Sequence, residues 1–168
     1  MSAKETKDGP AVPKLSFPPV DLDALEERLK AVWRDPSRAS SPSTHHEILP
    51  GLWLGGCEAR PAAATHVLTL VDPDRALPFP DVPDERRLVI RINDSQGEDI
   101  AAHFAASARF LAEVEAAGGT AYVHCQQGRS RSATIVISYL VLRGATLLEA
   151  RHFLETTVRS HLKIPFSI

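Results

Sequence analysis

The feature that most constrains the fold is the order of three segments over residues 120–144: an apolar run, a polar loop and a second, longer apolar run. The first run, TAYVH, ends at His124 and predicts a strand. The second run, ATIVISYLVLRG, is almost continuously apolar over 12 residues and closes on Gly144. Because that length is unusual for a strand, we expect a buried helix that begins near Ser132. Thr146-x-x-Glu149 is a capping-box pattern that opens a last helix.

Shorter apolar runs predict the other strands. EILPGLWLGG, broken by the turn signal Pro50-Gly51, predicts two short strands, and residues 66–71 and 86–92 predict two more. In residues 100–119, IAAHFAASARFLAEVEAAGG, mostly apolar residues recur every three or four positions from Ile100, and the segment ends at Gly118-Gly119, which predicts a helix. A strand–helix–strand crossover favours parallel pairing. We therefore expect an α/β fold with a central, mostly parallel mixed sheet flanked by helices.

Length and composition predict one domain behind an N-terminal extension. The 168 residues are enough for one well-cored domain and too few for two ordinary ones. Residues 1–20 hold four prolines among polar residues, which predicts a flexible tail. Residues 21–46 predict an amphipathic helix, over 21–34, and an exposed linker that ends with His45-His46. The domain itself is expected to span residues 47–168.

Charge and cysteine content exclude several classes of function. The formal net charge is −2, so no general nucleic-acid-binding surface is expected. No run approaches the roughly 18 apolar residues of a membrane span, and we expect a cytoplasmic or nuclear protein. Cys57 and Cys125 form no CxxC pair, and His45-His46 has no carboxylate cluster beside it, so no metal site is predicted. The oligomeric state stays open.

The loop between the strand and the buried helix has the composition of an oxyanion site. It reads HCQQGRSRS. The first N–H groups of a helix have no intrahelical partner and lie at the positive end of its dipole, so a phosphate group fits there. Gly128 permits the tight turn that points the amides inward, and the planar guanidinium of Arg131 can hold two phosphate oxygens. The residues expected to contact the anion are Gln126, Gln127, Gly128, Arg129, Ser130 and Arg131.

The same surroundings make Cys125 a candidate nucleophile. A thiol at a helix N-terminus, near arginine and His124, is expected to have a pKa well below its ordinary value of about 8.5. The thiolate can attack a phosphate held above it and form a cysteinyl-phosphate. Ser132 could ease departure of the thiolate in the second step, or could only cap the helix. His124 could tune the thiolate, or could be a buried strand end that supports the loop.

The loop resembles the HCxxGxxRS signature of cysteine-dependent protein tyrosine phosphatases, and the Ala133-Thr134 that follows resembles the dual-specificity branch. ILPGLWLGG is similar to the opening strand pair of that branch, and RINDSQGEDI, residues 91–100, to its general-acid loop. The resemblance covers roughly residues 47–160. It implies an atypical dual-specificity phosphatase that needs no metal or other cofactor and acts on phosphotyrosine, phosphoserine and phosphothreonine in proteins. It also implies that Asp94 is the general acid, with Asp99 as the nearest rival.

Three alternatives stay open. A phosphatase of the same fold could act on a phosphoinositide or another highly phosphorylated small molecule, although the neutral pair Gln126-Gln127 favours protein substrates. A non-catalytic module could bind phosphoproteins without turnover, although the thiol, the arginine and the candidate acid are all present. Cys57 could form a disulfide with Cys125 on oxidation, and an inert thiol is the simpler interpretation.

Overall fold

The computed structural model describes residues 45–58 and 60–158. The predicted tail, the predicted helix over 21–34 and the last ten residues lie outside the described residues. In chain order the elements are β1 (His45–Leu49), β2 (Leu52–Gly55), β3 (His66–Val71), the 3-10 helix η2 (Asp84–Arg86), β4 (Arg87–Arg91), the 3-10 helix η3 (Ile100–His103), α2 (Phe104–Ala116), β5 (Ala121–His124), α3 (Arg131–Leu142) and α4 (Leu147–Val158).

The strands form one mixed sheet in the order β1-β2-β5-β3-β4. β1 and β2 form an antiparallel hairpin, whereas β2, β5, β3 and β4 run parallel to one another. The predicted α/β fold with a mostly parallel mixed sheet is therefore confirmed. The crossover through α2 joins β4 and β5, which are parallel but not neighbours, because β3 lies between them.

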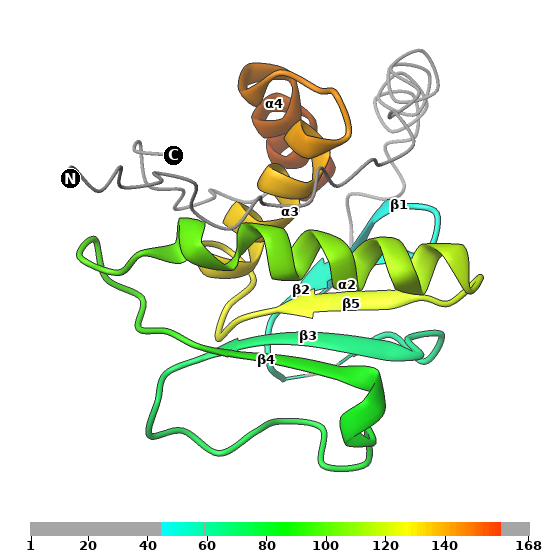
Figure 1. Ribbon diagram of the computed structural model, residues 1–168, viewed down its shortest axis with the longest axis vertical. Coiled ribbons are helices and arrows are strands. Elements are labelled where there is room, and N and C mark those ends of the chain that lie inside the picture. The colour runs from blue at the N-terminus through cyan, green and yellow to red at the C-terminus, as the bar shows by residue number, and fades with distance from the viewer. Residues whose placement is uncertain (1–44, 59, 159–168) are drawn as a thin grey trace, which may run out of the picture.

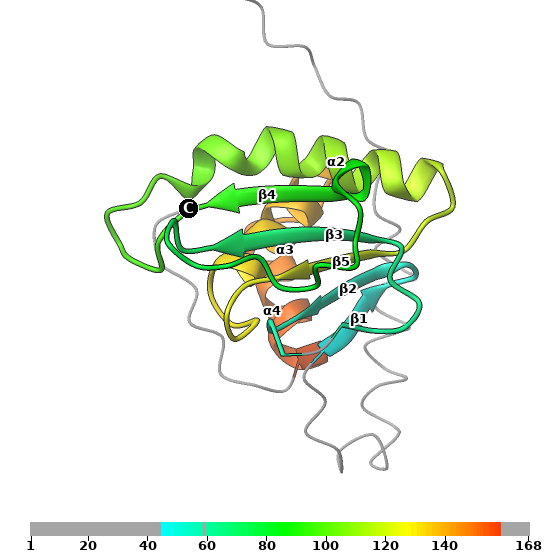
Figure 2. The same ribbon diagram turned by 90° about the horizontal axis from the view of Figure 1, so that it is seen from below.

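The helices α2, α3 and α4 lie on one side of the sheet, and the long connection from β3 to β4 crosses the other side (Figures 1 and 2). This two-sided packing follows from the alternation of side chains along β3. Leu68 and Leu70 belong to the main core with the helices, whereas Val67 packs with Val82 of the connection and with Tyr122 of β5. The sheet is thus buried on both faces, as parallel sheets usually are.

The helix α3 is the centre of the main core. Every residue from Arg131 to Leu140 is buried, which explains why this segment is almost continuously apolar. The helix begins at Arg131, one residue before its predicted start. The capping box of α4 is also confirmed, because the Thr146 hydroxyl accepts the Glu149 N–H at 3.2 Å and the Glu149 carboxylate accepts the Thr146 N–H at 2.8 Å.

One local prediction is wrong. His45 and His46, expected in an exposed linker, are half-buried residues of β1, and the His45 ring lies 5.6 Å from the ring of Trp53. Pairing with β2 and this ring contact allow β1 to include two residues that lie before its apolar ones. The helix predicted before Gly118-Gly119 is present: it begins at Ile100 with the 3-10 turn η3 and continues as α2, and the Asp99 side chain caps η3 by accepting the N–H of Ala102 at 3.2 Å.

No helix within residues 45–58 and 60–158 is long and apolar enough to cross a membrane. In the same part of the chain, no three His, Cys, Asp or Glu side chains gather where they could hold a metal ion.

Candidate active site

The candidate site lies at one edge of the sheet, where the carboxyl ends of β3, β4 and β5 meet. Parallel strands place their carboxyl ends at the same edge, which is where α/β proteins bind ligands. The segments that follow these strands begin with Asp72, Ile92 and Cys125. The HCQQGRSRS loop leaves β5 here and enters α3, so the predicted junction of strand, loop and helix is present.

The shape of the loop depends on its contact with the end of β2. Gly128 has φ 69°, and a Cβ atom added to it would lie 2.5 Å from the carbonyl carbon of Gly55. The N–H of Cys57 also donates to the carbonyl of Gln126 at 3.2 Å. Only glycine fits at residue 128, both for its backbone conformation and for this close approach. Cys57 itself is a half-buried free thiol.

Cys125 is 3% exposed at the bottom of the loop. The Ser132 hydroxyl donates to its Sγ atom at 3.2 Å. Burial raises the pKa of the Cys125 thiol. The hydrogen bonds from the Ser132 hydroxyl and from the backbone N–H groups of Ser132, Ser130 and Gln127 outweigh this effect, and the pKa lies below its ordinary value. The predicted direction is confirmed, with hydrogen bonds as the cause.

Ser132 does not cap α3. The residue before the helix is Ser130, whose carbonyl accepts the N–H of Thr134 at 2.9 Å, and the Ser132 hydroxyl is directed to Cys125 instead. Of the two roles considered for Ser132, the structure supports contact with the thiol.

His124 supports the loop as a neutral group. Its Nε2 atom lies 2.9 Å from the Thr69 hydroxyl, and its ring stacks on Tyr122 at 5.5 Å. Burial lowers the pKa of His124 to about 4, against the opposing effect of the Cys125 carbonyl. At neutral pH the imidazole is therefore uncharged and adds no positive charge beside the thiol. The geometry favours the supporting role over charge tuning.

Arg131 is held from outside the loop. Its Nη1 atom donates to the Asp72 carboxylate and to the Ile92 carbonyl, both at 2.7 Å. The residue is 4% exposed, and its buried Nε–H has no acceptor among the residues that the structure describes. A buried guanidinium N–H without an acceptor is costly, and an anionic oxygen would satisfy it.

Asp94 contacts the loop, although it lies 36 positions before its partner Ser130 in the sequence. It lies in the exposed segment after β4, and the Ser130 hydroxyl donates to its Oδ1 atom at 2.7 Å. The segment is closed by a hydrogen bond from the Asn93 side chain to Glu98, at 2.6 Å. Asp99 instead caps η3. The structure therefore brings Asp94, and not its rival, beside the candidate phosphate site.

Two further charged side chains contact the loop and were not predicted. Asp72 pairs with Arg131, and Arg75 donates from Nη1 to the Gln126 side chain at 3.2 Å. The position of Asp72 directly after a predicted parallel strand was an available signal. Nothing in the sequence indicates where the Arg75 side chain lies. Gln126 and Gln127 are exposed, and Arg129 is half-buried.

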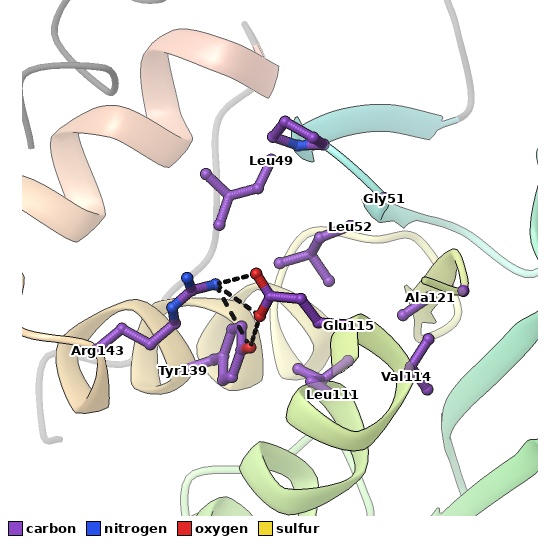
Figure 3. Close-up of a pocket in the computed structure, with 11 residues that line it drawn as sticks. Leu49, Gly51, Leu52, Leu111, Val114, Glu115, Ala121, Tyr139 and Arg143 are labelled. Atoms are coloured by element: carbon purple, nitrogen blue, oxygen red, sulfur yellow. Dashed lines mark hydrogen bonds and ion pairs between the residues drawn. The ribbon is translucent and has the colours of Figure 1, made fainter. Parts of the chain in front are cut away.

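A separate hollow lies near the amino ends of β2 and β5, away from the loop (Figure 3). Its volume of about 30 Å³ is room for one or two water molecules. Arg143 and Tyr139 both bind the Glu115 carboxylate there, at 3.0 and 2.9 Å. Because these polar groups satisfy one another, this hollow is a poorer candidate for catalysis than the loop.

The comparisons with known proteins agree with the geometry. Residues 63–164 match the family model described as dual specificity phosphatase, catalytic domain. Human dual specificity phosphatase 28 is 33% identical over 108 residues, which cover 61% of this chain and 61% of that protein. Human dual specificity protein phosphatase 22 is 35% identical over 103 residues, 57% of this chain and 54% of the relative. Dual specificity protein phosphatase Mpk3 of Drosophila melanogaster is 34% identical over 112 residues, which cover 62% of this chain and 27% of that protein.

Solved structures show the same fold. The crystal structure of human DUSP28 matches with a TM-score of 0.63 and 26% identity, over 72% of this chain and 85% of that one. The crystal structure of human tyrosine phosphatase-like serine/threonine/tyrosine-interacting protein matches with a TM-score of 0.65 and 26% identity. The match covers 73% of this chain and 88% of that one. The chain thus spans most of these solved domains, but only part of the full curated relatives.

Proposed function

The chain belongs to the dual specificity phosphatase catalytic domain family, and from this premise we propose that it is a protein phosphatase that hydrolyses phosphotyrosine and phosphoserine or phosphothreonine. One observation carries the proposal: a single loop and its neighbours hold a thiol, a buried guanidinium with an unsatisfied N–H and a carboxylate. These are the nucleophile, the oxyanion binder and the proton donor that phosphate-ester hydrolysis needs.

In the proposed first step, the Cys125 thiolate attacks the phosphorus atom of the substrate. The backbone N–H groups of the loop and the Arg131 guanidinium hold the equatorial oxygens as charge develops on them. The bond from phosphorus to the substrate oxygen breaks, and protonated Asp94 gives its proton to that oxygen. The products are the dephosphorylated side chain and a cysteinyl-phosphate.

In the proposed second step, water replaces the thiolate. Asp94, now a carboxylate, accepts a proton from the water that attacks phosphorus. The phosphorus–sulfur bond breaks, and the Ser132 hydroxyl, 3.2 Å from Sγ, stabilises the departing thiolate by a hydrogen bond. Inorganic phosphate then leaves, and the loop returns to its starting state.

Replacement of the two central residues tests the proposal. Phosphate release from an aryl phosphate and from a phosphotyrosine peptide would be measured for Cys125→Ser, Asp94→Ala and, as a matched control, Asp99→Asn. Cys125→Ser is expected to abolish turnover, and Asp94→Ala to lower kcat by about 10²- to 10⁴-fold, most for poor leaving groups. Asp99→Asn should retain most activity, because its side chain caps η3. Turnover by Cys125→Ser would contradict the nucleophile, and an Asp94→Ala rate equal to wild type would move the acid elsewhere.

The substrate class is tested separately. Protein substrates are supported by the exposed, uncharged side chains of Gln126 and Gln127 beside the site, since a phosphoinositide with several phosphates favours added positive charge. A panel of phosphopeptides and phosphoinositides compared by kcat/KM is expected to favour the peptides. Capture of phosphoproteins by the full chain carrying Asp94→Ala would then identify the physiological substrate, which is expected in the cytoplasm or nucleus.

A further inference from the structure

Asp72 pairs with two arginines through its two carboxylate oxygens, Arg131 within the phosphate loop and Arg75 beside it. Oδ1 accepts the Arg131 Nη1 donor at 2.7 Å, and Oδ2 lies 3.6 Å from the Nε atom of Arg75. Arg75 in turn donates to the Gln126 side chain at 3.2 Å. Gln126 directly follows the thiol and Arg131 ends the loop. Asp72 therefore links the two ends of the loop from outside it, at one end directly and at the other through Arg75.

The position of Asp72 is fixed by elements that do not belong to the loop. The pairing of β3 and β4 extends to Val71, the residue directly before Asp72, since the Ile92 N–H donates to the Val71 carbonyl at 3.0 Å. The turn that follows is held by Arg91, whose Nη1 atom donates to the carbonyls of Pro73 and Arg75, both at 2.8 Å. The carboxylate thus stands on a backbone that the sheet and Arg91 hold in place.

We propose that Asp72 is a positioning residue for phosphate binding: it fixes the Arg131 guanidinium so that its unsatisfied Nε–H stays oriented for an incoming oxyanion. The proposal rests on the proposed function, because it assumes that Arg131 binds phosphate. A long arginine side chain has many rotamers, and holding one of them in advance lowers the entropic cost of binding.

The Asp72 carboxylate also has an opposite effect, because its negative charge competes with phosphate for Arg131. The two effects predict different results for two variants. Asp72→Ala removes both the acceptor and the charge. Asp72→Asn removes the charge but keeps a side-chain oxygen that can accept from Arg131. Positioning therefore predicts that only the alanine variant is impaired, whereas charge competition predicts that both variants bind an oxyanion more tightly.

The experiment measures inhibition by orthovanadate and the kinetics of aryl-phosphate hydrolysis for the full chain. Asp72→Ala is expected to weaken vanadate inhibition and kcat/KM by about 10- to 100-fold, the size of effect known for a misplaced binding group. Asp72→Asn should stay within about threefold of wild type, since the Arg131 contact is kept. Asp74→Asn is the matched control, an exposed aspartate two positions away, and should match wild type.

A second readout separates positioning from general damage to the loop. Iodoacetate is an anion that needs a cationic binder, whereas iodoacetamide is neutral, and both alkylate a thiolate. Asp72→Ala is expected to slow alkylation of Cys125 by iodoacetate and to leave the iodoacetamide rate unchanged, because the thiolate is stabilised by Ser132 and backbone N–H groups. Equal slowing of both reagents would overturn the proposal. If the alanine variant does not fold, Asp72→Ser, which is also too short to reach Arg131, replaces it.

The outcomes also distinguish a failure of the proposed function from a failure of the proposed role of Asp72. A wild-type chain that neither hydrolyses aryl phosphate nor binds vanadate would overturn the proposed function. A wild-type chain that does both, with an Asp72→Ala variant equal to it or binding vanadate more tightly, would overturn the role of Asp72 alone.

Discussion

At Cys125, burial and hydrogen bonding act on the pKa in opposite directions, and hydrogen bonding is stronger. Burial alone would keep the thiol protonated, and a structural cysteine with 3% exposure would be inert. The donors that reverse this result belong to the loop and to the first turn of α3. The Ser132 hydroxyl is the donor that a single substitution can remove.

Ser132→Ala is expected to raise the Cys125 pKa, because it removes a hydrogen bond that stabilises the thiolate. The rate of alkylation by iodoacetamide rises with pH as the thiolate forms, so its midpoint should move to higher pH. The rate of cysteinyl-phosphate hydrolysis should also fall. Ser138→Ala, which removes a buried hydroxyl that donates to Ile135 in the same helix, is the control. An unchanged midpoint in Ser132→Ala would show that the backbone donors suffice.

Ser130 connects the candidate acid to the phosphate loop. Ser130→Ala removes the 2.7 Å hydrogen bond to Asp94, and the acid should then spend less time beside the leaving group. We expect kcat to fall by about tenfold with little change in KM, because a hydrogen bond to a carboxylate stabilises one geometry by about 1.5 kcal/mol or more. Ser95→Ala, in the same exposed segment, is the control. A loss confined to KM would assign Ser130 to substrate binding instead.

At the scale of the elements, the loop depends on its contact with β2 as much as on α3. Gly128 makes this contact, and Gly118 provides a comparison, because it has nearly the same φ of 67° with nothing within 4 Å of an added Cβ. Any difference between alanine substitutions at the two positions therefore reports the contact with Gly55.

Gly118→Ala is expected to lower the free energy of unfolding by about 1 kcal/mol, the cost of a left-handed conformation for a residue with a Cβ atom. Gly128→Ala should cost more and should also abolish vanadate binding, since the backbone of Gly55 cannot move aside without displacing β2. Urea unfolding and vanadate inhibition measure the two effects. Equal losses of stability with intact vanadate binding would mean that the loop adapts.

The sequence predicted where individual helices and strands lie better than it predicted which strands pair with one another. The helix predicted from the long apolar run, the two short strands on either side of Pro50-Gly51 and the capping box of α4 were correct, because each depends on local spacing or on turn and cap chemistry. The place of β3 between β4 and β5 could not be predicted, since pairing over a long separation has no local signal. For the same reason the contacts of Asp72 with Arg131 and of Arg75 with Gln126 were not predicted.

For the whole molecule, His124 makes stability depend on pH. Its pKa is about 4 in the folded protein, against about 6.5 when unfolded, so the unfolded chain binds more protons between these values. Stability is therefore lost as the pH falls from about 6.5 toward about 4. Between pH 7 and pH 5 the loss from this residue is expected to be about 2 kcal/mol.

Urea unfolding of wild type and His124→Gln at the two pH values measures this contribution. The variant is expected to lose less stability than wild type, because glutamine does not titrate. His46 and His66 also have lowered pKa values caused by burial and act in the same direction, but they are common to both proteins and cancel in the difference. Equal losses in the two proteins would show that His124 is not the group that titrates.

The donors around Cys125 have a consequence for the life of the chain before it folds. The N–H groups that lower its pKa converge on the sulfur only when the loop lies against β2 and α3 has formed. An unfolded or newly synthesised chain therefore carries a thiol of ordinary reactivity, which oxidants and electrophiles attack slowly at neutral pH. Folding itself therefore makes the proposed nucleophile reactive, at the moment when 97% of its surface becomes covered and only molecules that fit the loop can reach it.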